Sequence, residues 1–202
     1  MHEAYTTNDI KSIRRTQWQG KLYFSLVSNN HSCGVTILVR DDLDFKVILV
    51  RSDDNGRYTI MAAEVQGSSF LFVNNYALYS VQDQCSSYDN LNEDIEENIV
   101  EKENGIILVG YFNATLNSVW DCSGGNQSKK ASAKYNEDLC LDFDLIDIWR
   151  IRSPEIKPFT WRQKKPLIQK RFLANKRCLS SCLLYTSPSP RDLSTSRMPS
   201  SA

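Results

Sequence analysis

Near the end of the sequence lies a group of basic side chains that could bind a polyanion. Residues 150–177 hold ten Lys and Arg against the single Glu155, whereas residues 83–103 hold eight Asp and Glu against the single Lys102. The whole chain balances at 24 positive and 24 negative side chains, so only this asymmetry is informative. A basic end on a neutral chain fits either a local surface for a polyanion or a solvated tail, and charge alone leaves both open.

The six cysteines do not predict a metal site. They are scattered and form no CxxC pair, and the two histidines, His2 and His31, lie far in sequence from Cys178 and Cys182. A structural zinc site is therefore not expected. Scattered thiols are typical of a reducing compartment, so we expect an intracellular protein, nuclear or cytoplasmic. No stretch is long and apolar enough to cross a bilayer, and no membrane partner is expected.

The hydrophobic pattern predicts the elements that would position such residues. Four β-rich runs are separated by turn formers and indicate a largely antiparallel meander; they cover residues 33–40, 45–51, 57–65 and 69–76. Leu91, Ile95 and Ile99 recur every four residues and predict an amphipathic helix with a solvated acidic face. An apolar run over residues 106–112 is typical of a central strand.

A second helix is predicted over roughly residues 137–150, followed by a short strand at 159–162. The apolar side of that helix would consist of Leu141, Leu145, Ile148 and Trp149. We interpret Trp149, like Trp18 and Trp161, as a packing residue rather than a base-stacking one. Strands alternating with helices predict an α/β domain with helices packed on a sheet. These elements alone do not reveal a function.

The sequence changes in composition from Cys182 onward, where three of the six prolines lie. A disordered Ser/Pro-rich tail would explain this composition. The run CLLYTSPSPRD, followed by SRMPSSA, also resembles the translation of the two ends of a transposase-type sequencing adapter, and two matches in order favour that interpretation. We therefore expect one domain over residues 1–177 and a disordered tail over 178–202, of which 182–202 is not native protein.

Several short words in the remaining chain occur in the order found in one enzyme superfamily. They are EAYTTNDIKSIRRTQWQGKLYFS, GRYTIMAAEVQGSSFLFVNNYA, IILVGYFN, and the DIWR and FTWR words of FDLIDIWRIRSPEIKPFTWRQKKPLIQKR. Over essentially residues 1–171 the chain resembles the endonuclease domain of LINE-type non-LTR retrotransposons, in the exonuclease–endonuclease–phosphatase superfamily. The resemblance implies a four-layer α/β sandwich, with two packed mixed, largely antiparallel sheets flanked by helices. We expect this sandwich to be incomplete, because the family pattern is shortened at both ends.

The resemblance implies a Mg²⁺-dependent endonuclease that nicks target DNA, in a parent protein fused to a reverse transcriptase. Such hydrolysis needs a carboxylate to hold the metal, a base to deprotonate water, and donors that stabilise charge on the phosphoryl oxygens. Carried over residue by residue, Glu3 is the metal-binding carboxylate, Tyr76 reaches toward the scissile phosphate, and Asn113 is a phosphate-side donor. The DNA-facing positions implied by the resemblance are Arg150, Arg162, Lys164, Lys165, Lys170 and Arg171.

This sequence departs from the family at its general base. Tyr111 occupies the place of the water-orienting Asp, and a phenol with a normal pKa near 10 cannot replace a carboxylate at neutral pH. Losing a general base typically costs about 10²–10⁴-fold in rate. The Asp of the family's RLD word is absent from Arg171-Phe172-Leu173, and the closing Asp-His pair is missing. We therefore expect an inactive endonuclease fragment; the alternatives are a catalytically silent nucleic-acid-binding module and a chain that does not fold stably.

Overall fold

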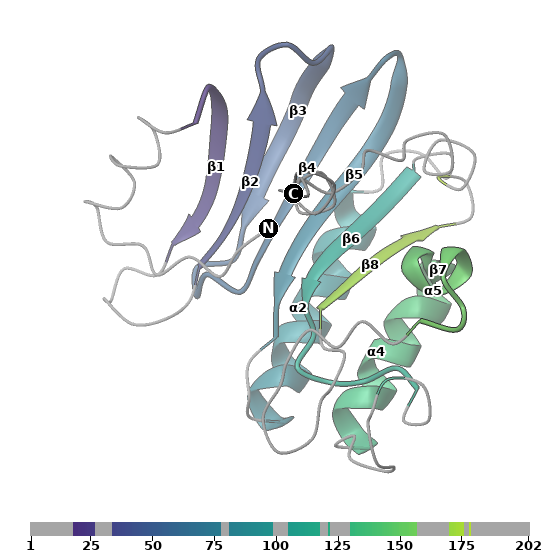
Figure 1. Ribbon diagram of the computed structural model, residues 1–202. Helices are drawn as coiled ribbons and strands as arrows, with labels where there is room; N and C mark the ends of the chain where they lie inside the picture. The colour runs from purple at the N-terminus through teal and green to yellow at the C-terminus, as the bar shows by residue number, and fades with distance from the viewer. Residues whose placement is uncertain are drawn as a thin grey trace, which may run out of the picture.

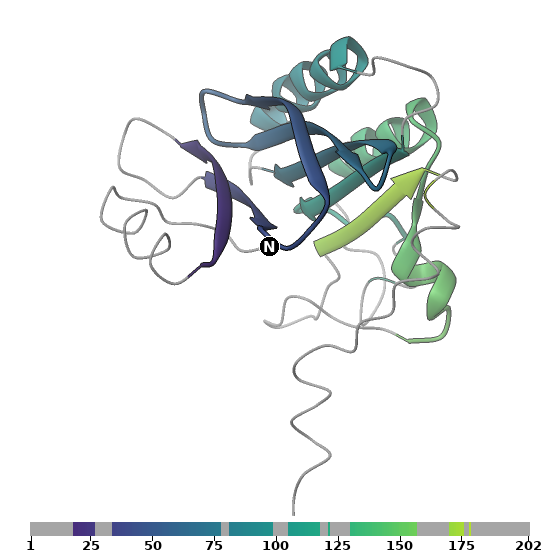
Figure 2. The same cartoon turned by 90° about the horizontal axis from the view of Figure 1, so that it is seen from above.

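The computed structural model describes residues 18–26, 34–77, 81–98, 105–117, 121, 130–156, 170–175 and 178. These residues form two β-sheets and three helices (Figure 1). Seen from above, the two longer helices lie on the same side of the larger sheet (Figure 2). The architecture is therefore the α/β arrangement that the alternation of strands and helices predicts.

The larger sheet positions most of the residues of interest. Its strand order is β3-β4-β5-β6-β8-β7. The strands are β3 (Phe45–Ser52), β4 (Tyr58–Val65), β5 (Ser68–Tyr76), β6 (Gly105–Tyr111), β7 (Leu145–Asp147) and β8 (Lys170–Asn175). All neighbours are antiparallel except β5 and β6, which are parallel and are connected through the helix α2 (Val81–Asn98). The sequence predicts the bounds of β3, β4, β5 and β6 to within one residue.

The predicted four-strand meander is wrong at its first junction. The strand expected at 33–40 is present as β2 (Gly34–Arg40), but β2 pairs along its whole length with β1 (Gly20–Leu26) and belongs to a separate two-stranded sheet. The short turn before β3 therefore carries the chain from one sheet to the other. Among the described residues, Asn74 Nδ2 on β5 donates to the carbonyl oxygen of Thr36 on β2 (3.1 Å), and Ser25 Oγ on β1 donates to the carbonyl oxygen of Asp53, just after β3 (2.9 Å).

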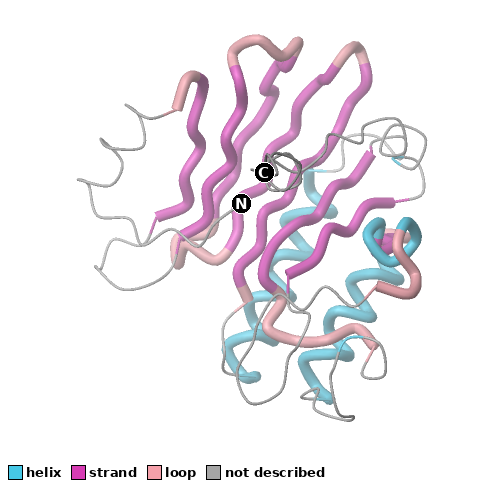
Figure 3. Tube along the Cα trace, viewed as in Figure 1, coloured by secondary structure: helices cyan, strands magenta, loops and turns pink. Residues whose placement is uncertain are grey.

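The helices α2 and α4 (Lys130–Asp142) lie against one face of the larger sheet (Figure 3). Both contribute buried apolar side chains to the core that they share with the sheet. Leu91 and Ile95, the predicted apolar positions of the first helix, are only 1% and 0% exposed. They pack in a core with strand residues such as Leu71 and Leu108. Burying one such side chain typically stabilises a fold by about 1.5–3 kcal/mol. Ile99 lies outside the described residues.

The second predicted helix, roughly 137–150, is wrong in its bounds. Helix α4 ends at Asp142, and Asp144 adopts a positive φ of 50°, which takes the chain off the helical path. The chain then forms β7 and the short helix α5 (Ile148–Arg152). The predicted apolar side is split by this break, because Leu145 and Ile148 are buried while Leu141 and Trp149 are 78% and 46% exposed. Trp149 is therefore not the core residue that the sequence predicts.

Several remaining predictions concern residues that the structure does not describe. The strand expected at 159–162, Trp161 and the tail from residue 179 lie outside the described residues. Trp18 is half-buried, and its indole Nε1 donates to the carbonyl oxygen of Val39 (3.4 Å), as expected of a packing residue. Within the described part of the chain, no helix is long and apolar enough to cross a membrane.

Candidate functional site

The carboxyl ends of β5 and β6 meet at one edge of the larger sheet, because these two strands are parallel neighbours. Tyr76, the last residue of β5, is paired in register with Tyr111, the last residue of β6. Their rings stack with centroids 5.7 Å apart and an interplanar angle of 21°. The backbone N–H of Ala77 donates to the carbonyl oxygen of Tyr111 (2.7 Å), which ties the two strand ends together. Ligands of open α/β sheets characteristically bind at such an edge.

Gly110 makes this close approach of the two strands possible. A Cβ atom at this position would lie 1.9 Å from the carbonyl oxygen of Asn75, the residue opposite it on β5. Its φ of 155° is also one that residues with side chains rarely adopt. The glycine in the GYFN word is therefore required by the backbone. It sets the spacing between the strands that carry Tyr76 and Tyr111.

Asn113 lies immediately beyond the same edge. The preceding Phe112 is buried in the core (1% exposed) and anchors the chain as it leaves β6. Asn113 then takes a positive φ of 50°, a conformation that Asn tolerates better than most residues. The structure thus places Tyr76 against Tyr111, with Asn113 two residues beyond Tyr111. The first residue of β8, Lys170, is paired with Tyr111 and so begins at this edge as well.

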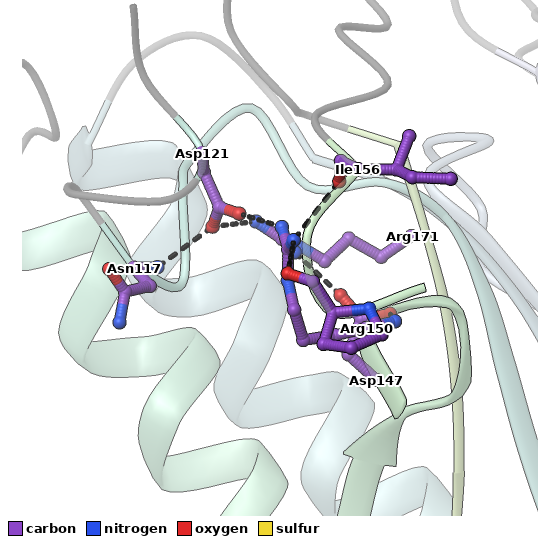
Figure 4. Close-up of polar contacts among 7 residues, drawn as sticks. Asn117, Asp121, Asp147, Arg150, Ile156 and Arg171 are labelled. Atoms are coloured by element: carbon purple, nitrogen blue, oxygen red, sulfur yellow. Dashed lines mark hydrogen bonds and ion pairs between the residues drawn. The ribbon is translucent and has the colours of Figure 1, made fainter. Parts of the chain in front are cut away.

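A buried ionic network lies beside this edge and links four segments of the chain (Figure 4). Asp121, which is 1% exposed, accepts hydrogen bonds from the guanidinium groups of Arg171 and Arg150, the latter at 3.0 Å, and from the backbone N–H of Asn117 at 2.8 Å. Arg171 also donates to Asp147 (2.6 Å). The network therefore joins the segment after β6 to β7, α5 and β8.

Asp147 has two roles in this network. One carboxylate oxygen accepts from the backbone N–H of Arg150 (3.1 Å), so Asp147 is the N-cap of α5, and the other accepts from Arg171. The Arg150 side chain also donates to the carbonyl oxygens of Pro154 (3.3 Å) and Ile156 (3.2 Å). These contacts hold the short helix and the residues after it against the sheet.

The network changes the interpretation of two predicted DNA-binding residues. The side chain of Arg171 is only 3% exposed and is held by two carboxylates, so its position does not fit a DNA contact. The side chain of Arg150 is 24% exposed and is partly neutralised by Asp121. For Lys170 the structure describes the backbone only. The remaining predicted positions lie outside the described residues: Glu3, Arg162, Lys164 and Lys165.

Sequence reasoning missed the two carboxylates of the network. The position of Asp147 immediately before α5 is a recognisable N-cap signal, but the helix was predicted to begin earlier and to run through it. Asp121 lies in a polar stretch of the sequence, 50 residues from its partner Arg171, and nothing local marks it as buried. In the structure it is helical, and its backbone N–H donates to the carbonyl oxygen of Asn117 (2.8 Å). Long-range ion pairs of this kind have no sequence periodicity that would reveal them.

Burial also perturbs ionisable groups near this part of the core. Burial raises the pKa of the Cys140 thiol to about 11, against the lowering effect of the Arg171 charge. Burial likewise raises the pKa of the Tyr88 phenol, whose hydroxyl donates to Asn136 Oδ1 (2.6 Å). Both groups therefore stay protonated at neutral pH. Neither is positioned as a base at the edge that holds Tyr76 and Asn113.

The donors at this edge can bind an anion, whereas the described residues do not supply a metal site. Phenol and amide groups such as those of Tyr76 and Asn113 can donate hydrogen bonds to phosphate oxygens. Among the described residues, no group of three or more His, Cys, Asp or Glu side chains is arranged to hold a metal ion. The carboxylates of the buried network, Asp121 and Asp147, are held by arginines.

Comparison with known proteins relates the chain to one transposon protein in sequence and to several nucleic-acid enzymes in fold. No protein-family model matches it. Over 163 residues it is 26% identical to the Transposon TX1 uncharacterized 149 kDa protein of Xenopus laevis; the match covers 80% of this chain and 12% of that protein. This chain therefore spans only a small part of the relative.

Among solved structures, the AP endonuclease LMAP from Leishmania major superposes with a TM-score of 0.64 at 15% identity, over 80% of this chain and 63% of that one. The 3′ phosphatase NExo from Neisseria, bound to a product DNA hairpin, gives 0.56 at 18% identity, over 82% and 70%. A Bacteroides thetaiotaomicron protein described as an endonuclease/exonuclease/phosphatase family protein gives 0.54 at 13% identity, over 84% and 66%.

Proposed function

We propose that this chain, which has the endonuclease/exonuclease/phosphatase fold, is part of the DNA endonuclease domain of a retrotransposon, and that this copy does not cut DNA. The fold and the sequence similarity to a transposon protein support the first half of the proposal. The observation that carries the second half is the edge formed by β5 and β6. There two phosphate-side donors, Tyr76 and Asn113, lie next to Tyr111, where the family resemblance requires a carboxylate.

Tyr76 and Asn113 would still allow this edge to bind a phosphodiester. A phosphodiester placed between Tyr76 and Asn113 would accept hydrogen bonds on its non-bridging oxygens, which orients it and stabilises added negative charge. Hydrolysis also needs a group that takes a proton from the attacking water. Tyr111 is held by its stack on Tyr76 and offers a phenol in place of that base. The site would therefore bind the anion without activating the nucleophile.

The Mg²⁺ ion implied by the family resemblance does not fit the described residues. They provide no cluster of carboxylates or histidines, and the one predicted metal ligand, Glu3, lies outside them. The proposal is therefore supported by the fold, by Tyr76, Asn113 and Tyr111, and by the absence of the Asp of the RLD word from Arg171-Phe172-Leu173.

The proposal is tested by nicking of supercoiled plasmid in Mg²⁺ with the full 202-residue chain. The wild-type protein and the Tyr111→Asp variant are both expected to leave the plasmid supercoiled, because the Asp of the RLD word is absent as well. Asn113→Ala is the matched control, since any true activity of this edge would fall further in that variant. Mg²⁺-dependent nicking by the wild-type chain that Asn113→Ala abolishes would overturn the proposed inactivity.

A second candidate function is a catalytically silent nucleic-acid-binding module. It is favoured by the exposed Arg152 on α5 and by the basic stretch that follows it in the sequence. Affinity for a DNA duplex would then fall steeply with added salt, since bound phosphates displace counterions. Equal anisotropy of a labelled duplex with and without the protein at low salt would exclude this function. We also propose that the parent protein carried a reverse transcriptase and acted inside the cell.

A further inference from the structure

The turn between β3 and β4 lies at the same edge of the larger sheet as Tyr76. Strand β4 begins at Tyr58, which is paired with Asn75 on β5. One residue beyond that pair, the backbone N–H of Tyr76 donates to the carbonyl oxygen of Arg57 (2.7 Å). Arg57 belongs to the turn, so the turn itself continues the β4–β5 pairing as far as the candidate site.

A buried ion pair closes this turn. The Arg57 guanidinium donates to both carboxylate oxygens of Asp53, from Nε at 2.9 Å and from Nη2 at 3.2 Å. The two side chains are only 10% and 7% exposed. One of these carboxylate oxygens also accepts from the backbone N–H groups of Asn55 and Arg57, each at 3.1 Å. The Asp53 carboxylate therefore holds the backbone of the turn and the guanidinium together.

Contacts with three other elements hold the turn in place. The hydroxyl of Ser25 on β1 donates to the carbonyl oxygen of Asp53 (2.9 Å). The backbone N–H of Asp53 donates to the carbonyl oxygen of Tyr58 on β4 (3.1 Å). The hydroxyl of Tyr58 in turn donates to the carboxylate of Asp94 on α2 (2.6 Å). The carbonyl oxygen of Arg57 is therefore fixed relative to both sheets and to a helix.

Stability alone does not explain why this ion pair is buried. Two charges removed from water lose their hydration, so a buried pair is often no more stabilising than apolar side chains of similar size. The turn before β3 shows the alternative, because its pair, Arg40 and Asp42, is 63% and 60% exposed and keeps much of its hydration. What a buried, doubly hydrogen-bonded pair can supply is one fixed conformation. Such a conformation is useful where a neighbouring group must be held in place.

We propose that the Asp53–Arg57 pair positions Tyr76 for phosphate binding, by fixing the carbonyl oxygen to which the Tyr76 backbone is bonded. The inference rests on the proposed function, in which Tyr76 and Asn113 bind a phosphodiester. Asp53 and Arg57 are positioning residues that act through this backbone bond. Tyr76 is then held from both sides, since its ring stacks on Tyr111 of β6. A donor that is already in place loses less entropy when the anion binds.

The test is a titration of the full, ¹⁵N-labelled chain with inorganic phosphate, followed through the amide signals of Ala77 and Asn113. Asp53→Asn should weaken phosphate binding about tenfold, because the charge-assisted bonds that fix the turn are lost. Arg57→Lys keeps the charge but loses the two-pronged contact, so it should weaken binding by about threefold. The matched control is Asp42→Asn, the same change in the exposed pair at the opposite end of β3, which should leave the affinity unchanged.

Hydrogen exchange separates positioning from a general loss of stability. The amide of Tyr76 is bonded to the turn, whereas Val73 lies further inside β5, between β4 and β6. In Asp53→Asn the protection of the Tyr76 amide should fall about tenfold more than that of Val73, because only the end of the strand is released. A merely structural pair would lower the protection of both amides equally.

The outcomes distinguish this inference from the proposed function. Wild-type phosphate binding that Asp53→Asn leaves unchanged, or that Asp42→Asn weakens equally, would overturn the inference and leave the proposed function standing. Equal loss of protection at Tyr76 and Val73 would do the same. Absence of any phosphate-dependent shift in the wild-type chain would overturn both the inference and the anion binding on which it rests. If Asp53→Asn does not fold, Arg57→Lys decides the same comparison.

Discussion

Gly110 on β6 lies opposite Asn75 on β5, and its contact and its φ together require glycine. Replacing Gly110 with Ala would place a Cβ atom 1.9 Å from the carbonyl oxygen of Asn75 and would strain a positive φ. We expect the free energy of unfolding to fall by about 3 kcal/mol, because the two strands must move apart. Urea denaturation followed by circular dichroism measures this change.

Gly67 offers the matched control for Gly110. It also has a positive φ, of 78°, but nothing lies within 4 Å of a Cβ atom built there. Gly67→Ala should therefore cost only the strain of the left-handed conformation, about 1 kcal/mol. Equal losses in the two variants would show that the contact with Asn75 is not what makes Gly110 necessary.

Cys140 makes the stability of the domain sensitive to alkaline pH. Burial raises the pKa of its thiol from 9.0 to about 11. Below pH 9 the folded and unfolded states both keep the proton, whereas between pH 9 and pH 11 the unfolded state loses it first, so unfolding becomes more favourable as pH rises. The free energy of unfolding should fall by about 1–2 kcal/mol across this window beyond any fall in Cys140→Ala. Identical pH profiles of the two proteins would contradict the assignment.

At the scale of secondary-structure elements, the buried network holds α5 and β8 in place. Asp121→Asn keeps the size of the side chain but removes the charge that neutralises the buried Arg171. Removing one partner of a buried ion pair typically costs about 3–5 kcal/mol. In Asp121→Asn, Arg150 and Arg171 would be left with Asp147 as the remaining carboxylate of the network. We expect a loss in this range by thermal or urea unfolding.

Asp42→Asn makes the same chemical change in an exposed pair. The side chains of Arg40 and Asp42 are 63% and 60% exposed, so water already screens their interaction. The expected cost is below about 1 kcal/mol. Similar losses for Asp121→Asn and Asp42→Asn would mean that the network near the site does not stabilise the fold.

The same elements show where the sequence is informative and where it is not. Runs of β-branched and apolar residues bounded by turn formers predict β3 to β6. This holds even for β3, which is the outermost strand of the larger sheet on its side and is mostly exposed. The helix boundary at Asp142 escapes prediction, since Leu141, Leu145 and Ile148 keep a helical spacing across the break. The separate sheet of β1 and β2 also escapes it. The apolar pattern of a strand shows which of its faces is buried but does not identify the neighbouring strand to which its backbone hydrogen-bonds.

For the site, the sequence predicts its members but not its neighbours. Tyr76, Tyr111 and Asn113 are found through short words, and the parallel pairing of β5 and β6 brings them to one edge. Arg171 is buried although the sequence predicts a DNA contact, and Trp149 is exposed although the sequence predicts a packing residue. Arg171 is buried because it pairs with the two carboxylates Asp121 and Asp147. Which side chain is buried depends on contacts between segments far apart in the sequence, and local sequence patterns do not encode those contacts.

At the scale of the whole molecule, the two sheets should differ in local stability. The β1–β2 pair is a two-stranded sheet of its own, held to the larger sheet by contacts of β2 with β4 and β5, and a two-stranded pair is only marginally stable without such packing. β4, β5 and β6 each have a strand on both sides and core residues on one face. Native-state hydrogen exchange should therefore show amides of β2 opening at a lower free energy than those of β5, through partial unfolding that leaves the larger sheet intact.

Asn74→Ala tests what couples the sheets, because the Asn74 side chain donates to the carbonyl oxygen of Thr36 on β2. In this variant protection of the β2 amides should fall by more than protection of β6, since the buried carbonyl oxygen loses its partner. Asn92→Ala removes an exposed hydrogen bond to Asp142 and should leave the difference between the sheets unchanged. If β2 and β5 instead exchange with one free energy and respond equally to Asn74→Ala, the two sheets unfold as a single cooperative unit. The hydrophobic contact between them, rather than the Asn74 bond, would then be what joins them.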